Sequence, residues 1–310
     1  MKTIFFGTPD FAVPSLRALL ESGEEVPAVV TQPDKVKGRG HKLSQPPVKE
    51  YALSRGLAVL QPSGIRTPAF LEDITRLDPD CIVVVAYGRI IPPSLLKLPH
   101  LGCINVHASL LPAYRGAAPI QWALINGEDK TGVTTMLMDE GLDTGDILLK
   151  EEVDIYDEDN AVTLAQRLSM IGASLLIKTL QGVKDKRIKP LPQSSEVSYA
   201  PPLKKENGRV DWSLSAREIV NLIRGTYPWP GAYCSMNGEK INFIKAAVAH
   251  DSNGGAGGRI EKISGNEILV GTGRGILAVS EVKPEGKKIM TAAAFMHGRH
   301  LKEGAFFDAL

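Results

Sequence analysis

Two short apolar runs constrain the fold of this chain more than any other feature of its sequence. Residues 81–86 and 103–106 are almost entirely apolar. A strand that is apolar on both faces belongs in the middle of a parallel sheet that helices cover on both sides. Runs with helical spacing, such as 11–22 and 161–181, alternate with these strand-like runs. The first half of the chain is therefore predicted to be α/β, with a doubly wound, mostly parallel sheet.

The second half has a different composition. Prolines at 190, 192, 201 and 202 interrupt any regular element, so residues 190–206 are predicted to form an interdomain linker. From residue 207 onward, short alternating runs are separated by glycines, which is typical of a small β-barrel of the OB-like kind. The predicted organisation is thus a first domain over 1–189, the linker, and a barrel over 207–310.

The bulk composition excludes several classes of protein. The 310 residues are 43% hydrophobic and 23% charged with a formal net charge of +1, as in ordinary globular proteins. The three cysteines, Cys81, Cys103 and Cys234, are far apart and form no metal-binding pattern with the histidines, which suits a reducing cytoplasm and predicts no metal. The sequence opens directly with a strand-like run, and no apolar run reaches the roughly 18 residues that span a membrane, so we expect neither a signal peptide nor a membrane partner.

Polar residues end the second apolar run. Asn105 and His107 are two residues apart, so in an extended strand they point to the same side. The C-terminal ends of strands line the ligand crevice of open α/β sheets. Asp143 follows a later strand in another turn-rich stretch. An amide, an imidazole and a carboxylate can stabilise an oxyanion and move a proton, but they include no nucleophile; a structural histidine in the core is the alternative for His107.

Two loops bear on ligand type. The first strand ends at Gly7, and Pro9 removes an N–H group that a phosphate would need, which argues against a dinucleotide site. The long loop over 32–49 is basic and is either a solvated charged surface or a contact for a polyanion. Its only acid is Asp34, and its basic residues are Lys35, Lys37, Arg39, His41, Lys42 and Lys49.

Several motifs together identify a family. Asn105-x-His107, followed by Ser109–Pro112, Arg115–Ile120 and Asp143–Asp146, resembles the formyltransferase family that uses 10-formyltetrahydrofolate. The resemblance is strongest to the branch that acts on methionyl-tRNA, and it covers essentially the whole chain. The segments that carry this closer resemblance are Gly7–Ala12, Thr31–Asp34, Gly38–Gly40, Asp211–Trp212 and Pro228–Pro230.

The resemblance implies a function and a set of roles. It implies transfer of the formyl group of 10-formyltetrahydrofolate to initiator methionyl-tRNA in the cytoplasm, with no metal and no obligate protein partner, by a Rossmann-like catalytic domain and a tRNA-binding barrel. Asn105, His107 and Asp143 match the catalytic residues. The remaining matches are folate-binding residues Ser109, Leu110, Leu111, Pro112, Tyr87, Gly88 and Ile90, and tRNA-binding residues Arg39, Lys37 and Lys42.

The chemistry agrees with this assignment, because the substrate amine attacks the formyl carbon and no protein nucleophile is needed. Asn105 and His107 would stabilise the resulting oxyanion, and Asp143 would help to move the proton. Three alternatives stay open. A glycinamide ribonucleotide formyltransferase would lack the barrel, and a sugar-nucleotide formyltransferase would lack the basic loop around Arg39. A non-catalytic RNA-binding protein would not need the three polar residues.

Overall fold

The computed structural model describes residues 1–37, 42–251 and 255–308, and its chain divides into two compact units. The division differs from the predicted one: residues up to Pro201 cluster with the first unit, and two short segments of the N-terminal half cluster with the second. The first unit consists of Met1–Pro119, Lys130–Asp154 and Ala165–Pro201, and the second of Ile120–Asp129, Ile155–Leu164 and Pro202–Leu310.

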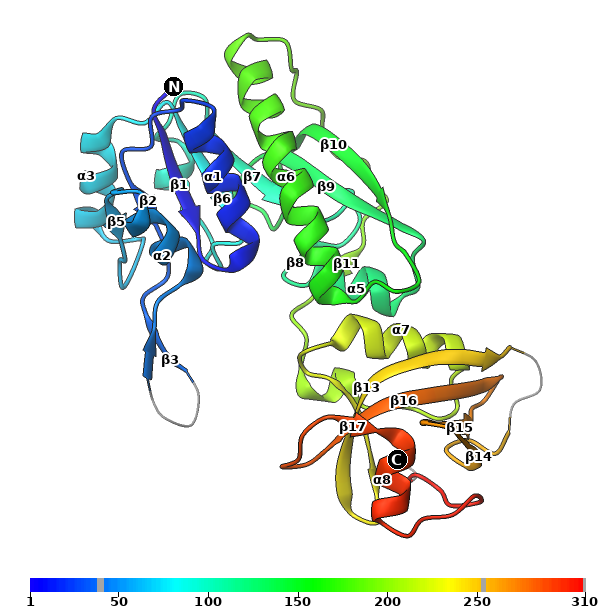
Figure 1. The fold of residues 1–310 in the computed structure, drawn as a ribbon. Coiled ribbons are helices and arrows are strands. Elements are labelled where there is room, and N and C mark those ends of the chain that lie inside the picture. Colours follow the sequence, from blue (N-terminus) through cyan, green and yellow to red (C-terminus); the bar gives the residue numbers. More distant parts are fainter. Residues whose placement is uncertain (38–41, 252–254, 309–310) are drawn as a thin grey trace. The chain divides into compact units, whose positions relative to one another are not determined.

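The first unit is built on a seven-stranded sheet in the order β10-β9-β7-β6-β1-β2-β5 (Figure 1). The strands from β7 to β5 run parallel, and β9 and β10 add an antiparallel edge. The mostly parallel sheet is therefore confirmed. The bounds are β1 (Thr3–Gly7), β2 (Val29–Val30), β5 (Val59–Leu60), β6 (Cys81–Val85), β7 (Cys103–His107), β9 (Lys130–Leu137) and β10 (Asp146–Asp154).

Helices cover both faces of this sheet. On one face, Phe6 of β1 packs with Phe70 and Ile74 of α3 and with Leu95 of α4 in a single buried cluster. On the other face, Gly172 of α6 lies close against the side chains of β7 and β9, where a larger residue would not fit. The helices are α1 (Val13–Glu21), preceded by the 3-10 turn η1 (Asp10–Ala12), then α2 (Pro47–Ser54), α3 (Pro68–Leu77), α4 (Pro93–Leu96) and α6 (Ala161–Lys184).

Two small strand pairs complete the first unit. Strand β8 (Arg115–Gly116) pairs in parallel with β11 (Tyr199–Ala200). This part of the predicted linker is therefore bound to the first unit. Leu191 adds a bridge to Ile147 of β10. Within the predicted basic loop, β3 (Lys35–Lys37) and β4 (Lys42–Ser44) form an antiparallel hairpin. The sequence analysis did not predict either strand pair, because prolines and lysines are poor strand formers.

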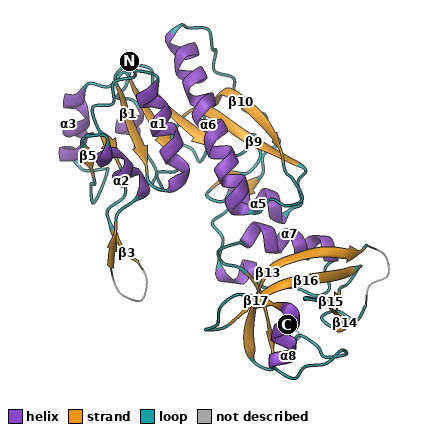
Figure 2. Cartoon of the chain, in the orientation of Figure 1, coloured by secondary structure: helices purple, strands orange, loops and turns teal. Residues whose placement is uncertain are grey.

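The second unit is an antiparallel sheet domain, as the sequence predicts (Figure 2). Its sheet has the order β12-β13-β16-β15-β14, with the short β17 against β16, and it packs around the amphipathic helix α7. The bounds are α5 (Pro119–Ile125), η2 (Lys205–Gly208), α7 (Ala216–Thr226), β12 (Ala232–Met236), β13 (Glu239–His250), β14 (Ile260–Ser264), β15 (Glu267–Gly271), β16 (Ile276–Pro284), β17 (Met290–Thr291) and α8 (Ala292–Gly298).

The C-terminal segment closes the gap between the two edge strands of this sheet. Ile260 of β14 donates its N–H to the carbonyl of Ala305, and the Asp308 N–H reaches the carbonyl of Ser235 in β12. Phe307 packs against Trp212 and Phe243 inside the core. Residues 304–308 therefore turn an open sheet into a barrel-like enclosure. In the part of the chain that the structure describes, no helix combines the length and the apolar character needed to cross a membrane.

Candidate active site

Strand β7 carries the first two candidate residues. All five of its residues are buried between β6 and β9, and Asn105 lies opposite Val84 on one side and Met136 on the other. Val106 faces Gly172 of α6, so the alternation of the strand turns Asn105 and His107 to the face away from α6. The shared orientation predicted for these two residues is confirmed, at the C-terminal edge of the parallel strands.

His107 meets Asp143 across this edge. Its Nδ1 lies 3.7 Å from Asp143 Oδ2, and the two side chains are only 7% and 14% exposed. Its Nε2 lies 3.0 Å from the carbonyl oxygen of Tyr114. Both ring nitrogens thus face oxygen atoms of the chain. The ring is fixed from two sides and remains close to a carboxylate that can exchange a proton with it.

Asp143 is held in an unusual conformation. It lies in the loop 138–145 between β9 and β10 and has φ +53°, the left-handed region that non-glycine residues rarely adopt. The Gly116 N–H donates to Asp143 Oδ2 at 2.8 Å and aims the carboxylate. Next to it, a Cβ on Gly145 would collide with the carbonyl of Leu137. The position of the carboxylate therefore depends on the backbone of two other segments.

A glutamine from the predicted linker holds the same loop. Gln193 Nε2 donates to the carbonyl of Asp143 at 2.8 Å and to that of Gly145 at 2.7 Å. Its Oε1 accepts from Arg115 Nε at 3.1 Å and Nη2 at 2.6 Å. Sequence reasoning missed Gln193 entirely. The only available signal was the motif residue Arg115, whose buried guanidinium requires an acceptor.

The Asn105 side chain differs from its neighbours. It is 9% exposed, yet among the described residues no group accepts or donates a hydrogen bond to its amide. Because the Asn105 side chain is not fully enclosed, its amide can form hydrogen bonds with groups outside the chain. The Asn105 amide is thus available to a ligand at the strand end that also carries His107.

The predicted folate segment forms a turn directly after β7. Thr134 Oγ1 donates to the carbonyl of Ser109 at 2.7 Å and accepts from the Leu111 N–H at 3.1 Å. Lys150 Nζ donates to the Leu111 carbonyl at 2.7 Å. The Leu111 side chain is fully buried, while Leu110 and Pro112 are partly exposed. The surface that this turn offers to a ligand therefore comes from Leu110 and Pro112.

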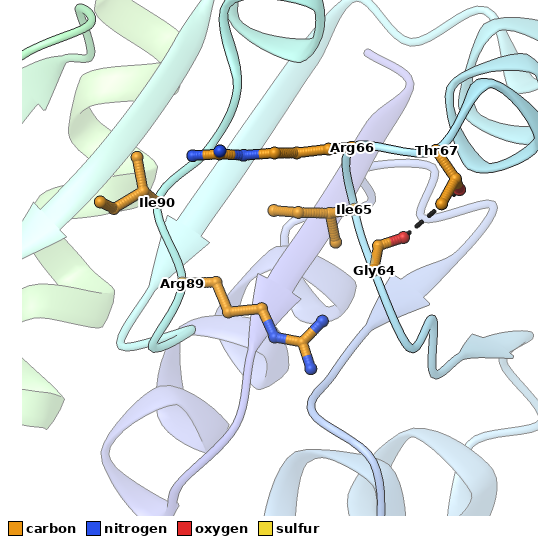
Figure 3. Close-up of a pocket in the computed structure, with 6 residues that line it drawn as sticks. All are labelled: Gly64, Ile65, Arg66, Thr67, Arg89 and Ile90. Atoms are coloured by element: carbon orange, nitrogen blue, oxygen red, sulfur yellow. Dashed lines mark hydrogen bonds between the residues drawn. The ribbon is translucent and has the colours of Figure 1, made fainter.

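The second predicted folate segment follows β6. The Tyr87 ring is buried edge-on against Phe6, so its side chain lines no open surface. The Tyr87 carbonyl accepts hydrogen bonds from Thr8 Oγ1 and Gln32 Nε2. Gly88 has φ +84° and turns the chain outward to Ile90, which is 70% exposed. An open hollow of about 370 Å³ adjoins Ile90, and in Figure 3 Arg66 reaches across it toward this residue. Its lining residues are Gly64, Ile65, Arg66, Thr67, Arg89 and Ile90.

Two of the three predicted tRNA-binding residues lie on the strands of the hairpin. Lys37 and Lys42 are backbone partners at the ends of β3 and β4, and Arg39 lies outside the described residues. At the base of the hairpin, Asp34 accepts hydrogen bonds from Lys49 at 2.8 and 2.9 Å and from Gln61 at 2.7 Å. These bonds, the one from Lys49 first, lower the pKa of Asp34 below its ordinary value of 3.8. Within the described ranges, no group of three His, Cys, Asp or Glu side chains could hold a metal ion.

Comparisons with known proteins identify the family of this chain. The family model described as formyl transferase matches residues 1–180, and the model of the formyl transferase C-terminal domain matches residues 202–300. A methionyl-tRNA formyltransferase from Thermodesulfovibrio yellowstonii is 54% identical over 97% of both chains, and one from Pelobacter propionicus is 50% identical over 97% of this chain and 94% of its own. The chain belongs to the methionyl-tRNA formyltransferase family.

A solved structure shows the same fold at greater distance. The N-formyltransferase from Helicobacter canadensis, in complex with folinic acid and dTDP-3-aminofucose, superimposes with a TM-score of 0.68 at 20% identity and covers 90% of this chain and 98% of its own. At that identity the likeness concerns the fold alone. The family assignment rests on the relatives with about half of their residues identical, which favours the methionyl-tRNA branch over the sugar-nucleotide alternative.

Proposed function

We propose that this chain transfers the formyl group of 10-formyltetrahydrofolate to the amino group of methionine on initiator methionyl-tRNA. The observation that carries the proposal is the close His107–Asp143 pair beside the unpaired Asn105 amide, in a chain that shares 54% of its residues with a methionyl-tRNA formyltransferase. These groups supply what transfer to an amine needs, and transfer to an amine needs no protein nucleophile.

In the proposed reaction, the methionine nitrogen attacks the formyl carbon to give a tetrahedral oxyanion. The Asn105 amide and the Nδ1–H of His107, whose 3.7 Å separation from Asp143 Oδ2 is too long for a hydrogen bond, donate hydrogen bonds to this oxyanion. The bond between the formyl carbon and N10 then breaks, the attacking nitrogen loses a proton, and N10 gains one. Asp143, 3.7 Å from the imidazole, exchanges this proton directly or through water.

We place the folate between the two turns that follow β6 and β7. Leu110, Pro112 and Ile90 give this edge partly exposed apolar side chains, which suit a flat pterin ring. Ser109 and Leu111 support the turn from within, and Tyr87 and Gly88 shape the loop that presents Ile90. The folinic acid complex of the Helicobacter canadensis relative supports a folate site in this fold.

The tRNA contacts are proposed for the hairpin and for the antiparallel sheet domain of the second unit. Lys37, Lys42 and Arg39 bring positive charge to the hairpin, and the phosphate backbone of tRNA is its natural partner. We assign Arg39 to base edges near the acceptor end, where it favours initiator over elongator tRNA. Translation initiation in the cytoplasm would then be the setting of the reaction.

The decisive experiment combines the purified chain with 10-formyltetrahydrofolate and charged initiator tRNA and measures formyl-methionine after hydrolysis of the ester. Glycinamide ribonucleotide and an amino-sugar nucleotide serve as competing acceptors. Formylation of the tRNA substrate that is lost in His107→Ala supports the proposal. Faster formylation of either small acceptor would replace it with another member of the family, and tRNA binding without formylation would replace it with a simple RNA-binding role.

The role of Arg39 needs a separate measurement. We expect Arg39→Ala to reduce the ratio of kcat/KM between initiator and elongator methionyl-tRNA at both low and high salt. A phosphate contact would instead weaken both tRNAs equally and lower the salt slope by about one. An unchanged ratio rules out the selective role.

A further inference from the structure

The structure contains one side chain that connects the loop of Asp143 to a buried charge. Gln193 comes from the proline-rich segment that precedes β11, and it reaches the loop between β9 and β10 on one side and Arg115 on the other. The segment is itself fixed, because Leu191 pairs with Ile147, and the carbonyl and Oγ of Ser198 accept hydrogen bonds from the N–H groups of Arg115 and Tyr114. The segment is therefore fixed on both sides of Gln193.

Only one orientation of the Gln193 amide satisfies its surroundings. Arg115 is a pure donor, so the group that faces it must be Oε1, which accepts two hydrogen bonds. The carbonyls of Asp143 and Gly145 are pure acceptors, so they must face the amide nitrogen, which donates to both. Arg115 is 8% exposed, and no carboxylate of the described residues pairs with it. The buried guanidinium thus fixes the amide, and the amide fixes the loop.

The Asp143 backbone requires such support. Its φ of +53° lies in the left-handed region, which non-glycine residues adopt less readily than the right-handed one. The two carbonyls that Gln193 holds lie on either side of Thr144, so the amide clamps the backbone immediately after Asp143. The Gly116 N–H can aim the carboxylate only while this backbone stays in place.

We propose that Gln193 is a positioning residue for the transfer: it holds Asp143 against His107 through the Asp143 and Gly145 carbonyls, in an orientation set by Arg115. Gln193 touches no reacting atom and acts only through Asp143. This inference rests on the proposed function, since it assigns Asp143 a part in the reaction.

The test separates the hydrogen bonds from Arg115 from those to the Asp143 and Gly145 carbonyls. Gln193→Ala removes both sets. Gln193→Glu keeps an oxygen that faces Arg115 but replaces the amide donor with a second acceptor opposite the two carbonyls. We expect both variants to lose about 100-fold in kcat for formylation, the scale that a shift of about 1 Å produces. KM for the folate and the melting temperature of Gln193→Glu should stay near the wild-type values, because its pair with Arg115 persists.

Two further variants make the result specific. Ser195→Ala changes an exposed residue of the same segment and should keep wild-type kcat. Adding Gln193→Ala to Asp143→Asn should cost less than about threefold beyond Asp143→Asn alone, since residues that act as one unit are not additive. Wild-type kcat in Gln193→Glu, or full additivity in the double variant, would overturn the inference. A wild-type chain without formylation activity would instead refute the proposed function.

Discussion

The loop that carries Asp143 and the hairpin of β3 and β4 both follow strands of the same sheet, yet they are fixed in very different ways. The loop is bound by the Gly116 N–H, by Gln193 and by its own Asp139, which accepts from Gly141 and Thr144. The hairpin is tied at its base by Asp34, and among the described strands β3 pairs only with β4. Its side chains Val36 and Leu43 are 54% and 67% exposed.

The difference follows from what each segment is proposed to do. Group transfer needs a carboxylate held within a fraction of an ångström, and only contacts within the chain can provide that before the substrate arrives. A segment that meets a large partner can leave its contacts unmade until binding. The partner then supplies the burial that the exposed side chains of the hairpin lack.

The largest expected effect is at the fixed region. We expect His107→Ala to lower kcat for formylation about 1,000-fold with little change in KM for tRNA, because the imidazole acts in the transition state. Asp143→Asn should act similarly. Steady-state kinetics with saturating folate measures both. A rise in KM for tRNA with unchanged kcat would mean that the two regions do not divide their tasks in this way.

Asn105→Ala should cost about 100-fold in kcat, as expected for one oxyanion donor. Because the Asn105 amide has no partner among the described residues, the substitution should leave the melting temperature almost unchanged. Thermal unfolding of the same preparation provides this control. Strong destabilisation would show that the amide serves the fold, and near wild-type turnover would show that it serves neither the fold nor the reaction.

Asp34→Asn should raise KM for tRNA about fivefold or less and leave kcat unchanged, since losing this partly buried pair with Lys49 loosens the base of the hairpin but removes no reacting group. Hydrogen bonds from Lys49 and Gln61 lower the pKa of Asp34, so the anchor is present above its ordinary value of 3.8 and is lost as the pH falls below it. Between about pH 6 and 8, KM of the wild-type chain should therefore show no pH dependence that arises from Asp34, because the group stays ionised throughout. A step in KM within that range that Asp34→Asn abolishes would contradict the assignment.

The parts of the fold that could be predicted are those set by neighbouring residues. The apolar runs of β6 and β7 and the long helix α6 follow from local periodicity, and so does the shared orientation of Asn105 and His107. Their positions depend on the spacing of side chains along one strand or helix, which the sequence displays directly.

The parts that could not be predicted depend on distant residues. Gln193 meets Asp143 across 50 positions and Arg115 across 78, and its proline-rich surroundings resemble a linker. The closure of the second unit by residues 304–308 joins strands from two hairpins, and the hairpin over 35–44 forms from a lysine-rich run. In each case tertiary contacts outweigh the local preference, and a single sequence does not display them.

The smallest expected effect concerns the exposed face of the hairpin. Leu43 is 67% exposed, so Leu43→Ser should change the free energy of unfolding by less than about 0.5 kcal/mol, measured by urea denaturation. If the hairpin meets tRNA, the same variant should raise KM for tRNA slightly while KM for the folate stays constant. A matched substitution at exposed Leu53 of α2 should change neither value. Marked destabilisation by Leu43→Ser would mean that the hairpin is packed as firmly as the Asp143 loop, and the contrast between the two regions would then fail.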